Sequence, residues 1–129
     1  LHTSYLPYNR GSSPNFFSFL EDNPKGVTIH LMSEGLDEGD ILCQRELHFD
    51  EEKETFASTY EALLQEMEKL FRENWQQIRE GSIIPVKHTG TATYHRMKDL
   101  DAIREKVDFD WTMKIADFKR ANEKAMGKD

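Results

Sequence analysis

The sequence lacks the features that mark several large classes of protein. It has a single cysteine, Cys43, which excludes an internal disulfide and suits a reducing compartment. No apolar run approaches the ~20 residues that a membrane-spanning helix needs, and no signal-peptide pattern opens the chain. We therefore predict a cytoplasmic protein that has no membrane partner.

Positive charge is also scarce. The 129 residues contain 17 Lys and Arg against 24 Asp and Glu, which gives a formal net charge of −7. A protein that binds a phosphate backbone needs a basic face, because its affinity comes largely from the release of counterions. The charge balance therefore argues against nucleic acid as a partner of this segment.

Several catalytic signatures are missing as well. None of the five histidines shows the i, i+4 or His-x-His spacing of metal ligands, and the single cysteine has no second cysteine to join it. The sequence has no Gly-x-Gly-x-x-Gly, no phosphate-binding loop and no Gly-x-Ser-x-Gly elbow. We expect no metal site, and nucleophilic catalysis is not supported.

What the chain does have is a regular order of predicted elements. A helix is predicted over 14–21, with Ser13 as its cap and Pro14 in the first turn. Residues 26–32 alternate between apolar and other side chains, which is typical of a half-buried strand. A second strand is predicted over 40–47, and the two could form a hairpin or lie side by side in a mixed sheet.

The strongest periodicity predicts a long amphipathic helix over 54–80, ended by Gly81. We expect its apolar stripe to face a core; the stripe comprises Phe56, Tyr60, Leu63, Leu64, Met67, Leu70, Phe71, Trp75 and Ile78. A short strand over 82–86, a loop over 87–101 and a final helix built on Trp111, Ile115 and Phe118 follow. This order indicates an α/β domain in which the helix flanks mixed sheet strands.

Two stretches near the start together resemble a known family. "HTSYLPYNRG" followed by "GVTIHLMSEGLDEGDILCQ" is similar to the formyltransferases that use 10-formyltetrahydrofolate. That family has Asn-x-His-x-Ser-Leu-Leu-Pro, then Arg-Gly, Gly-Val-Thr and Asp-x-Gly-Asp; Tyr5 departs from it at the first Leu. The resemblance implies a three-layer α/β fold, of which residues 1–129 would be the second half, a single partial domain without the nucleotide-fold half. The motif Asn would then lie immediately before Leu1, so we expect this chain alone to be inactive.

The resemblance also implies roles for individual residues. His2 would be the catalytic histidine, which stabilises the oxyanion or carries a proton, and Asp37 would orient it and raise its pKa. The cosubstrate would be 10-formyltetrahydrofolate, and no metal is implied. The turn that walls its pterin ring would comprise Ser33, Glu34, Gly35, Leu36 and Asp37.

The formyl acceptor is an amine whose identity the motifs leave open. Likeness to sugar-nucleotide enzymes favours a nucleotide-linked amino sugar, with Tyr8, Asn9, Arg10, Tyr94 and His95 on the acceptor side. Methionyl-tRNA formyltransferase is the first alternative, although that enzyme adds a basic C-terminal β-barrel. A non-catalytic folate-binding remnant and a hydrolase that releases formate are further alternatives. The oligomeric state stays open, with a homodimer as one option.

Overall fold

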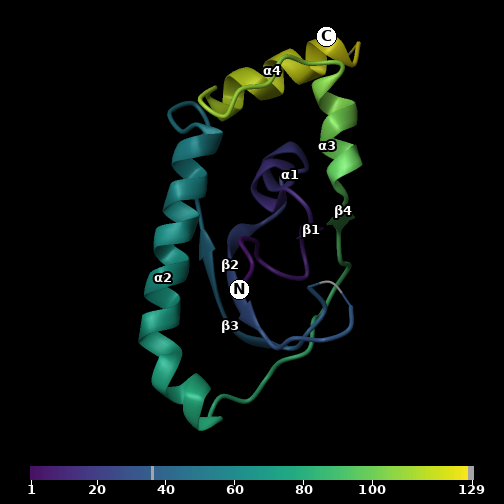
Figure 1. Ribbon diagram of the computed structural model, residues 1–129. Helices are drawn as coiled ribbons and strands as arrows, with labels where there is room; N and C mark the ends of the chain where they lie inside the picture. The colour runs from purple at the N-terminus through teal and green to yellow at the C-terminus, as the bar shows by residue number, and fades with distance from the viewer. Residues whose placement is uncertain (36, 128–129) are drawn as a thin grey trace.

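The computed structural model describes residues 1–35 and 37–127 and has a mixed α/β architecture. Helix α2 runs along one side, α3 along the other, and α4 crosses between their ends, with α1 near the middle (Figure 1). The elements are β1 (Arg10–Gly11), α1 (Pro14–Leu20), β2 (Lys25–His30), β3 (Ile41–Leu47), α2 (Phe56–Glu80), β4 (Tyr94–His95), α3 (Met97–Arg104) and α4 (Ile115–Ala125).

Strands β2 and β3 form an antiparallel pair, which confirms that the two predicted strands are neighbours. Their register pairs Lys25 with Leu47 and is interrupted by a bulge after Ile29. The predicted burial of only one face of β2 is wrong, because Thr28 is fully buried as well as its apolar neighbours. The loop that begins at His2 covers that face, and the Thr28 hydroxyl donates to Ser4 O at 2.7 Å.

Helix α2 packs on this strand pair and confirms the long predicted helix. It starts at a capping box in which the Thr55 and Ser58 side chains bond each other's backbone N–H groups, and it ends at Gly81 with φ 70°. Leu63, Met67 and other buried side chains meet the apolar face of β2. The predicted stripe is wider than the buried one, because Tyr60, Leu64 and Trp75 are exposed.

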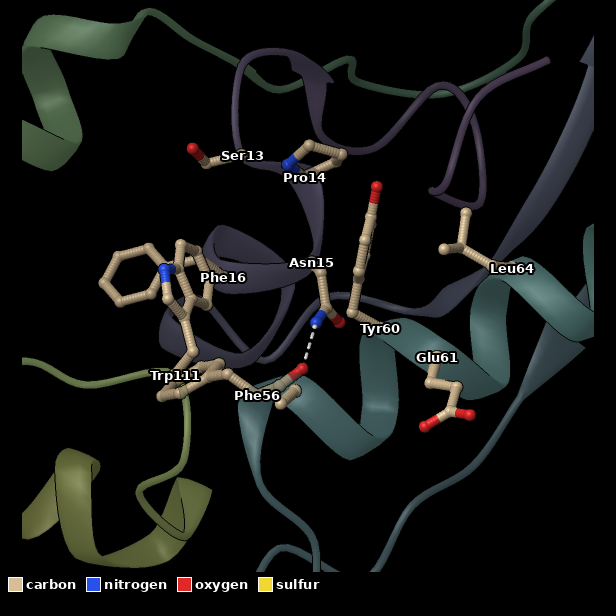
Figure 2. A pocket seen from close by; sticks show the side chains of 10 residues that line it. Ser13, Pro14, Asn15, Phe16, Phe56, Tyr60, Glu61, Leu64 and Trp111 are labelled. Atoms are coloured by element: carbon tan, nitrogen blue, oxygen red, sulfur yellow. Dashed lines mark hydrogen bonds between the residues drawn. The ribbon is translucent and has the colours of Figure 1, made fainter.

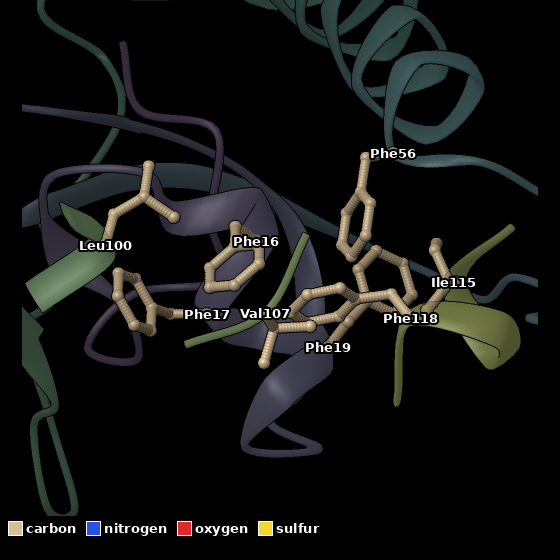
Figure 3. Close-up of a cluster of buried hydrophobic side chains, with 8 residues drawn as sticks. All are labelled: Phe16, Phe17, Phe19, Phe56, Leu100, Val107, Ile115 and Phe118. Atoms are coloured by element: carbon tan, nitrogen blue, oxygen red, sulfur yellow. The ribbon is translucent and has the colours of Figure 1, made fainter. Parts of the chain in front are cut away.

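The second core is aromatic and surrounds α1 (Figure 3). Phe16 is 1% exposed, and its ring lies 5.0 to 5.4 Å from four other phenylalanine rings. Helix α4 contributes two side chains to this core, although Trp111 lies before the helix and not in it. The buried members are Phe16, Phe17, Phe19, Phe56, Leu100, Val107, Ile115 and Phe118.

The segment after α2 differs from its prediction. The expected strand over 82–86 reduces to one bridge between Val86 and Ile41, because Ile84 and Val86 are largely exposed and have no further strand partner in the described chain. The expected loop over 87–101 contains β4 and the start of α3. No helix within the described residues is long and apolar enough to cross a membrane.

Candidate active site

The opening segment and the acidic turn meet at Asp37, as the motifs predict. His2 Nδ1 lies 3.5 Å from Asp37 Oδ1, and both side chains are largely buried, at 10% and 14% exposed. His2 is held at this depth because its backbone bridges Thr28 on β2. The predicted catalytic pair is therefore in contact distance for an ion pair when the imidazole is protonated.

A third side chain, which the sequence did not indicate, faces the same carboxylate. His30 is the last residue of β2, and its Nε2 lies 3.8 Å from Asp37 Oδ1. Asp37 is therefore flanked by His2 and His30. The position of His30 in the sequence could have indicated this contact. His30 ends a strand immediately before the acidic turn, and the turn brings Asp37 back to the strand end.

Hydrogen bonds to carbonyl groups fix the protonated nitrogen of both histidines. His2 Nε2 lies 2.8 Å from Asn9 O, and His30 Nδ1 lies 2.8 Å from Leu31 O. A carbonyl oxygen only accepts, so each of these nitrogens carries a proton. In the neutral rings the nitrogen that faces Asp37 is consequently the basic one.

Burial lowers the pKa of His2 below its usual value, because the charged ring loses contact with water. The hydrogen bond to Asn9 O and the charge of Asp37 act in the opposite direction, and the nearby His30 acts with burial. Asp37 therefore raises the pKa of His2, as predicted, but burial lowers it by more. The lowered pKa favours the neutral form of His2, in which Nδ1 can accept a proton.

Backbone geometry fixes the carboxylate of Asp37. The residue has a left-handed backbone with φ 55°, which Asp tolerates better than most residues, and its Oδ2 accepts a hydrogen bond of 2.9 Å from Gly11 N.

Gly39, two residues later, is irreplaceable for steric reasons. A Cβ there would come within 1.6 Å of the Leu31 carbonyl oxygen.

The predicted pterin turn lines a cavity of about 220 Å³ beside the histidines. The Ser33 hydroxyl donates to Gly35 O at 3.1 Å and so closes the turn on itself. Leu36, also predicted for this wall, lies outside the described residues. The cavity is lined by His30, Met32, Ser33, Glu34, Gly35 and Asp37, so a ligand in it would lie against Asp37 and His30.

The predicted acceptor residues form one neighbourhood through the parallel pairing of β1 and β4. Arg10 is opposite Tyr94 and Gly11 is opposite His95. Between these strands Asn9 N donates to Thr93 Oγ1 at 2.6 Å, a contact that the sequence did not indicate. Two segments more than eighty residues apart in sequence are thus brought to the edge of the site.

The acceptor residues differ in how far they can reach a ligand. Tyr8 and Arg10 are partly exposed, and Tyr94 is 47% exposed. Asn9 is 0% exposed, with φ 59°, and its side-chain amide has no partner among the described residues. His95 stacks on Phe17 at 3.7 Å, and its two ring nitrogens face carboxylates. The ring of His95 is therefore engaged by protein groups, and Asn9 makes its contacts through its backbone N–H and carbonyl groups.

A larger cavity, of about 520 Å³, lies between the start of α1 and α2 (Figure 2). Its walls are mainly apolar and aromatic, with Tyr60 and Trp111 on opposite sides and Asn15 between them. None of the predicted site residues lines it, and Glu61 is its only titratable carboxylate. The smaller cavity beside Asp37 is therefore the better candidate for chemistry. Among the described residues, no group of three or more His, Cys, Asp or Glu could hold a metal ion.

Comparison with known proteins gives consistent matches. The profile of the formyl transferase family matches residues 1–74. The solved formyltransferase PseJ from Anoxybacillus kamchatkensis, in complex with UDP-4,6-dideoxy-4-formamido-L-AltNAc and tetrahydrofolate, is 43% identical, with a TM-score of 0.85 over 95% of this chain and 63% of that one. This fold match confirms the predicted mixed α/β formyltransferase architecture.

Curated relatives fall into two groups by acceptor. The dTDP-4-amino-4,6-dideoxyglucose formyltransferase of Mycobacterium bovis is 33% identical over 81% of this chain and 44% of its own length. The methionyl-tRNA formyltransferase of a Geobacillus species is 36% identical over 87% of this chain and 34% of its own length. The chain thus spans less than half the length of these relatives.

Proposed function

This chain belongs to the formyl transferase family, and from that premise we propose that its protein transfers a formyl group from 10-formyltetrahydrofolate to an amino sugar linked to a nucleotide. One observation carries the proposal. Asp37 sits between two histidines beside a cavity, in a chain 43% identical to a formyltransferase that was solved with a formylated UDP-sugar and tetrahydrofolate.

The chemistry uses His2 as the proton carrier. The amine of the acceptor attacks the formyl carbon, and a tetrahedral oxyanion forms. The Nδ1 atom of His2 takes the proton that the amine loses, since Nε2 already donates to Asn9 O. Collapse of the intermediate expels the folate nitrogen, to which the imidazolium returns the proton.

Asp37 stabilises the charged form of that histidine. Its carboxylate lies 3.5 Å from His2 Nδ1, so the positive charge that develops on the ring meets a fixed negative charge. Little reorganisation is required, because Gly11 N already holds the other carboxylate oxygen at 2.9 Å. His30 takes a supporting position on the same carboxylate.

The two substrates would occupy opposite sides of this pair. The pterin ring of the folate would lie in the cavity walled by 33–35 and Asp37, where backbone groups can bond its polar edge. The acceptor would lie along β1, with Tyr8 and Arg10 in contact and Tyr94 and His95 shaping the wall. The buried Asn9 would support this strand and hold His2 through its carbonyl group.

The second candidate acceptor is methionyl-tRNA, which the likeness to methionyl-tRNA formyltransferases favours. The net charge of −7 argues against it, since a tRNA needs a basic surface on its enzyme. A cytoplasmic location fits either acceptor and stays a prediction. We keep the amino sugar as the proposed substrate.

A panel of acceptors tests the proposal. The protein at its full length is incubated with 10-formyltetrahydrofolate and with UDP- or dTDP-linked 4-amino sugars, 3-amino sugars or methionyl-tRNA, and the products are separated by chromatography. We expect at least one nucleotide-linked amino sugar to gain about 28 mass units, the increase when CHO replaces H. The tRNA should stay unchanged. Rapid formylation of the tRNA with every sugar inert would refute the sugar assignment.

A further inference from the structure

A histidine outside the predicted site connects its two sides. His88 lies in the segment between α2 and β4 and is partly buried. Its Nε2 is 2.8 Å from Gly39 O in the Asp37 turn, and its Nδ1 is 2.6 Å from Arg10 Nη2 on β1. One imidazole ring therefore bridges the turn that carries the catalytic carboxylate and the strand that faces the acceptor.

The two partners of His88 determine which nitrogen carries the proton. A guanidinium group only donates hydrogen bonds and a carbonyl oxygen only accepts them. Nε2 is therefore the protonated nitrogen, which donates to Gly39 O, and Nδ1 accepts from Arg10. In this arrangement His88 is neutral, because a second proton would remove the acceptor that Arg10 uses.

A neutral partner has a specific consequence for Arg10. A buried carboxylate in this position would orient the guanidinium and also cancel its charge, whereas an imidazole orients it and leaves the charge in place. Glu38 lies 3.7 Å from Arg10 Nη1, but its side chain is 55% exposed, so water screens this pair. Arg10 itself is only 18% exposed, and its direction depends on His88.

We propose that His88 is a positioning residue that directs Arg10 toward the diphosphate of a nucleotide-linked acceptor. The inference rests on the proposed function and adds a residue to it. A diphosphate is the chemical group that fits a fixed, charged guanidinium, which can bond two oxygens at once. Because the same ring holds Gly39, the acceptor strand and the Asp37 turn keep a constant separation.

Steady-state kinetics of the full-length protein test the role. We expect His88→Ala to raise the KM for the nucleotide-linked sugar about tenfold, while kcat and the KM for the folate change by less than about threefold. His88→Gln should restore most of the loss, because its amide can accept from Arg10 and donate to Gly39 O. His48→Ala is the control, since that side chain is 86% exposed.

A mutant cycle separates positioning from a general structural effect. If His88 acts through Arg10, His88→Ala should have almost no further effect on the acceptor KM in an Arg10→Ala background. An equal effect in both backgrounds would overturn the inference, and so would an unchanged KM in the single variant. Wild-type protein that formylates no nucleotide-linked sugar would overturn both the proposed function and this inference.

Nuclear magnetic resonance of the ¹⁵N-labelled histidine rings gives a test that does not depend on turnover. We expect His88 in the resting protein to show a protonated Nε2 and an unprotonated Nδ1. In Arg10→Ala the Nδ1 signal should move, because it loses its donor, while the His48 signals stay in place. A protonated Nδ1 in the wild-type protein would overturn the inference even if His88→Ala does not fold.

Discussion

The aromatic core around α1 and the polar cluster around Asp37 are built in different ways. The ring of Phe16 has four phenylalanine neighbours at centroid distances of 5.0 to 5.4 Å, so no single neighbour accounts for its packing. The carboxylate of Asp37 instead has one hydrogen bond, from Gly11 N, and one histidine within 4 Å on each side. We therefore expect substitutions in the core to change mainly stability and substitutions in the cluster to change mainly the rate of the proposed reaction.

The largest expected effect is on stability in the aromatic core. Phe16→Ala should lower the free energy of unfolding by about 3–5 kcal/mol, because it removes a fully buried ring and leaves a cavity. Tyr60→Ala, at a side chain that is 47% exposed, is the control and should cost far less. Urea unfolding of both variants measures the difference, and equal losses would contradict the division between core and surface.

The next largest effect is on the rate of formyl transfer, and it comes from a substitution in the polar cluster alone. Asp37→Asn should lower kcat for formyl transfer by about 10²–10³-fold, because the charge that stabilises protonated His2 is gone. Stability should change little, since Asn tolerates the left-handed φ and its amide oxygen can still accept from Gly11 N. Asp22→Asn is a matched control, with φ 53° but no contact with the histidines. Equal rates for the two variants would remove Asp37 from the mechanism.

A smaller effect is expected at His95, which stacks on Phe17 of the aromatic core and lies opposite Gly11 in the β1–β4 pair. His95→Ala should lower the free energy of unfolding by about 1–2 kcal/mol, because it loses the stack on Phe17 and the pairing with Glu21. The acceptor KM should rise less than in Arg10→Ala, because His95 shapes the wall and Arg10 makes contact. Thermal unfolding of His95→Ala gives the change in stability, and steady-state kinetics of His95→Ala and Arg10→Ala give the two values of the acceptor KM. A larger KM effect at His95 would make it a direct acceptor ligand.

The smallest effect is a pH dependence of stability that comes from His2. Its pKa is lowered in the folded state by burial, so the unfolded chain binds a proton more readily. This contribution to stability is present above the unfolded pKa of about 6.5 and is lost as the pH falls below it. His2→Gln should flatten the unfolding free energy against pH between 7 and 5, compared with the wild type. Parallel curves would show that His2 is not responsible.

Elements with local signals could be predicted from the sequence. The sequence predicts a helix over 54–80 and α2 spans Phe56–Glu80, because its period, its cap and its terminal Gly81 all lie within or next to the segment. The motif around His2 and Asp37 predicts that these two side chains lie together, and they are 3.5 Å apart; their catalytic role stays a prediction. These predictions depend on residues close together in sequence or on a spacing typical of the family.

What depends on distant contacts could not be predicted. Strand β4 exists only because β1 lies beside it, and nothing in residues 94–95 alone shows a strand. His88 has no motif of its own, and its partners Arg10 and Gly39 are each about fifty or more positions away in sequence. The exposure of Tyr60, Leu64 and Trp75 was also missed, because periodicity gives the direction of a stripe but not the width of the surface that covers it.

The most direct test of the account follows the formyl carbon itself. The full-length protein is mixed with 10-formyltetrahydrofolate labelled with ¹³C in the formyl group and with a UDP-linked 4-amino sugar, and the reaction is followed by ¹³C magnetic resonance. We predict a formamide carbon signal that grows with the wild-type protein and grows about 10²–10³-fold more slowly with Asp37→Asn. Labelled free formate without formamide would contradict formyl transfer and identify a hydrolase, and an unchanged cosubstrate signal would contradict catalysis.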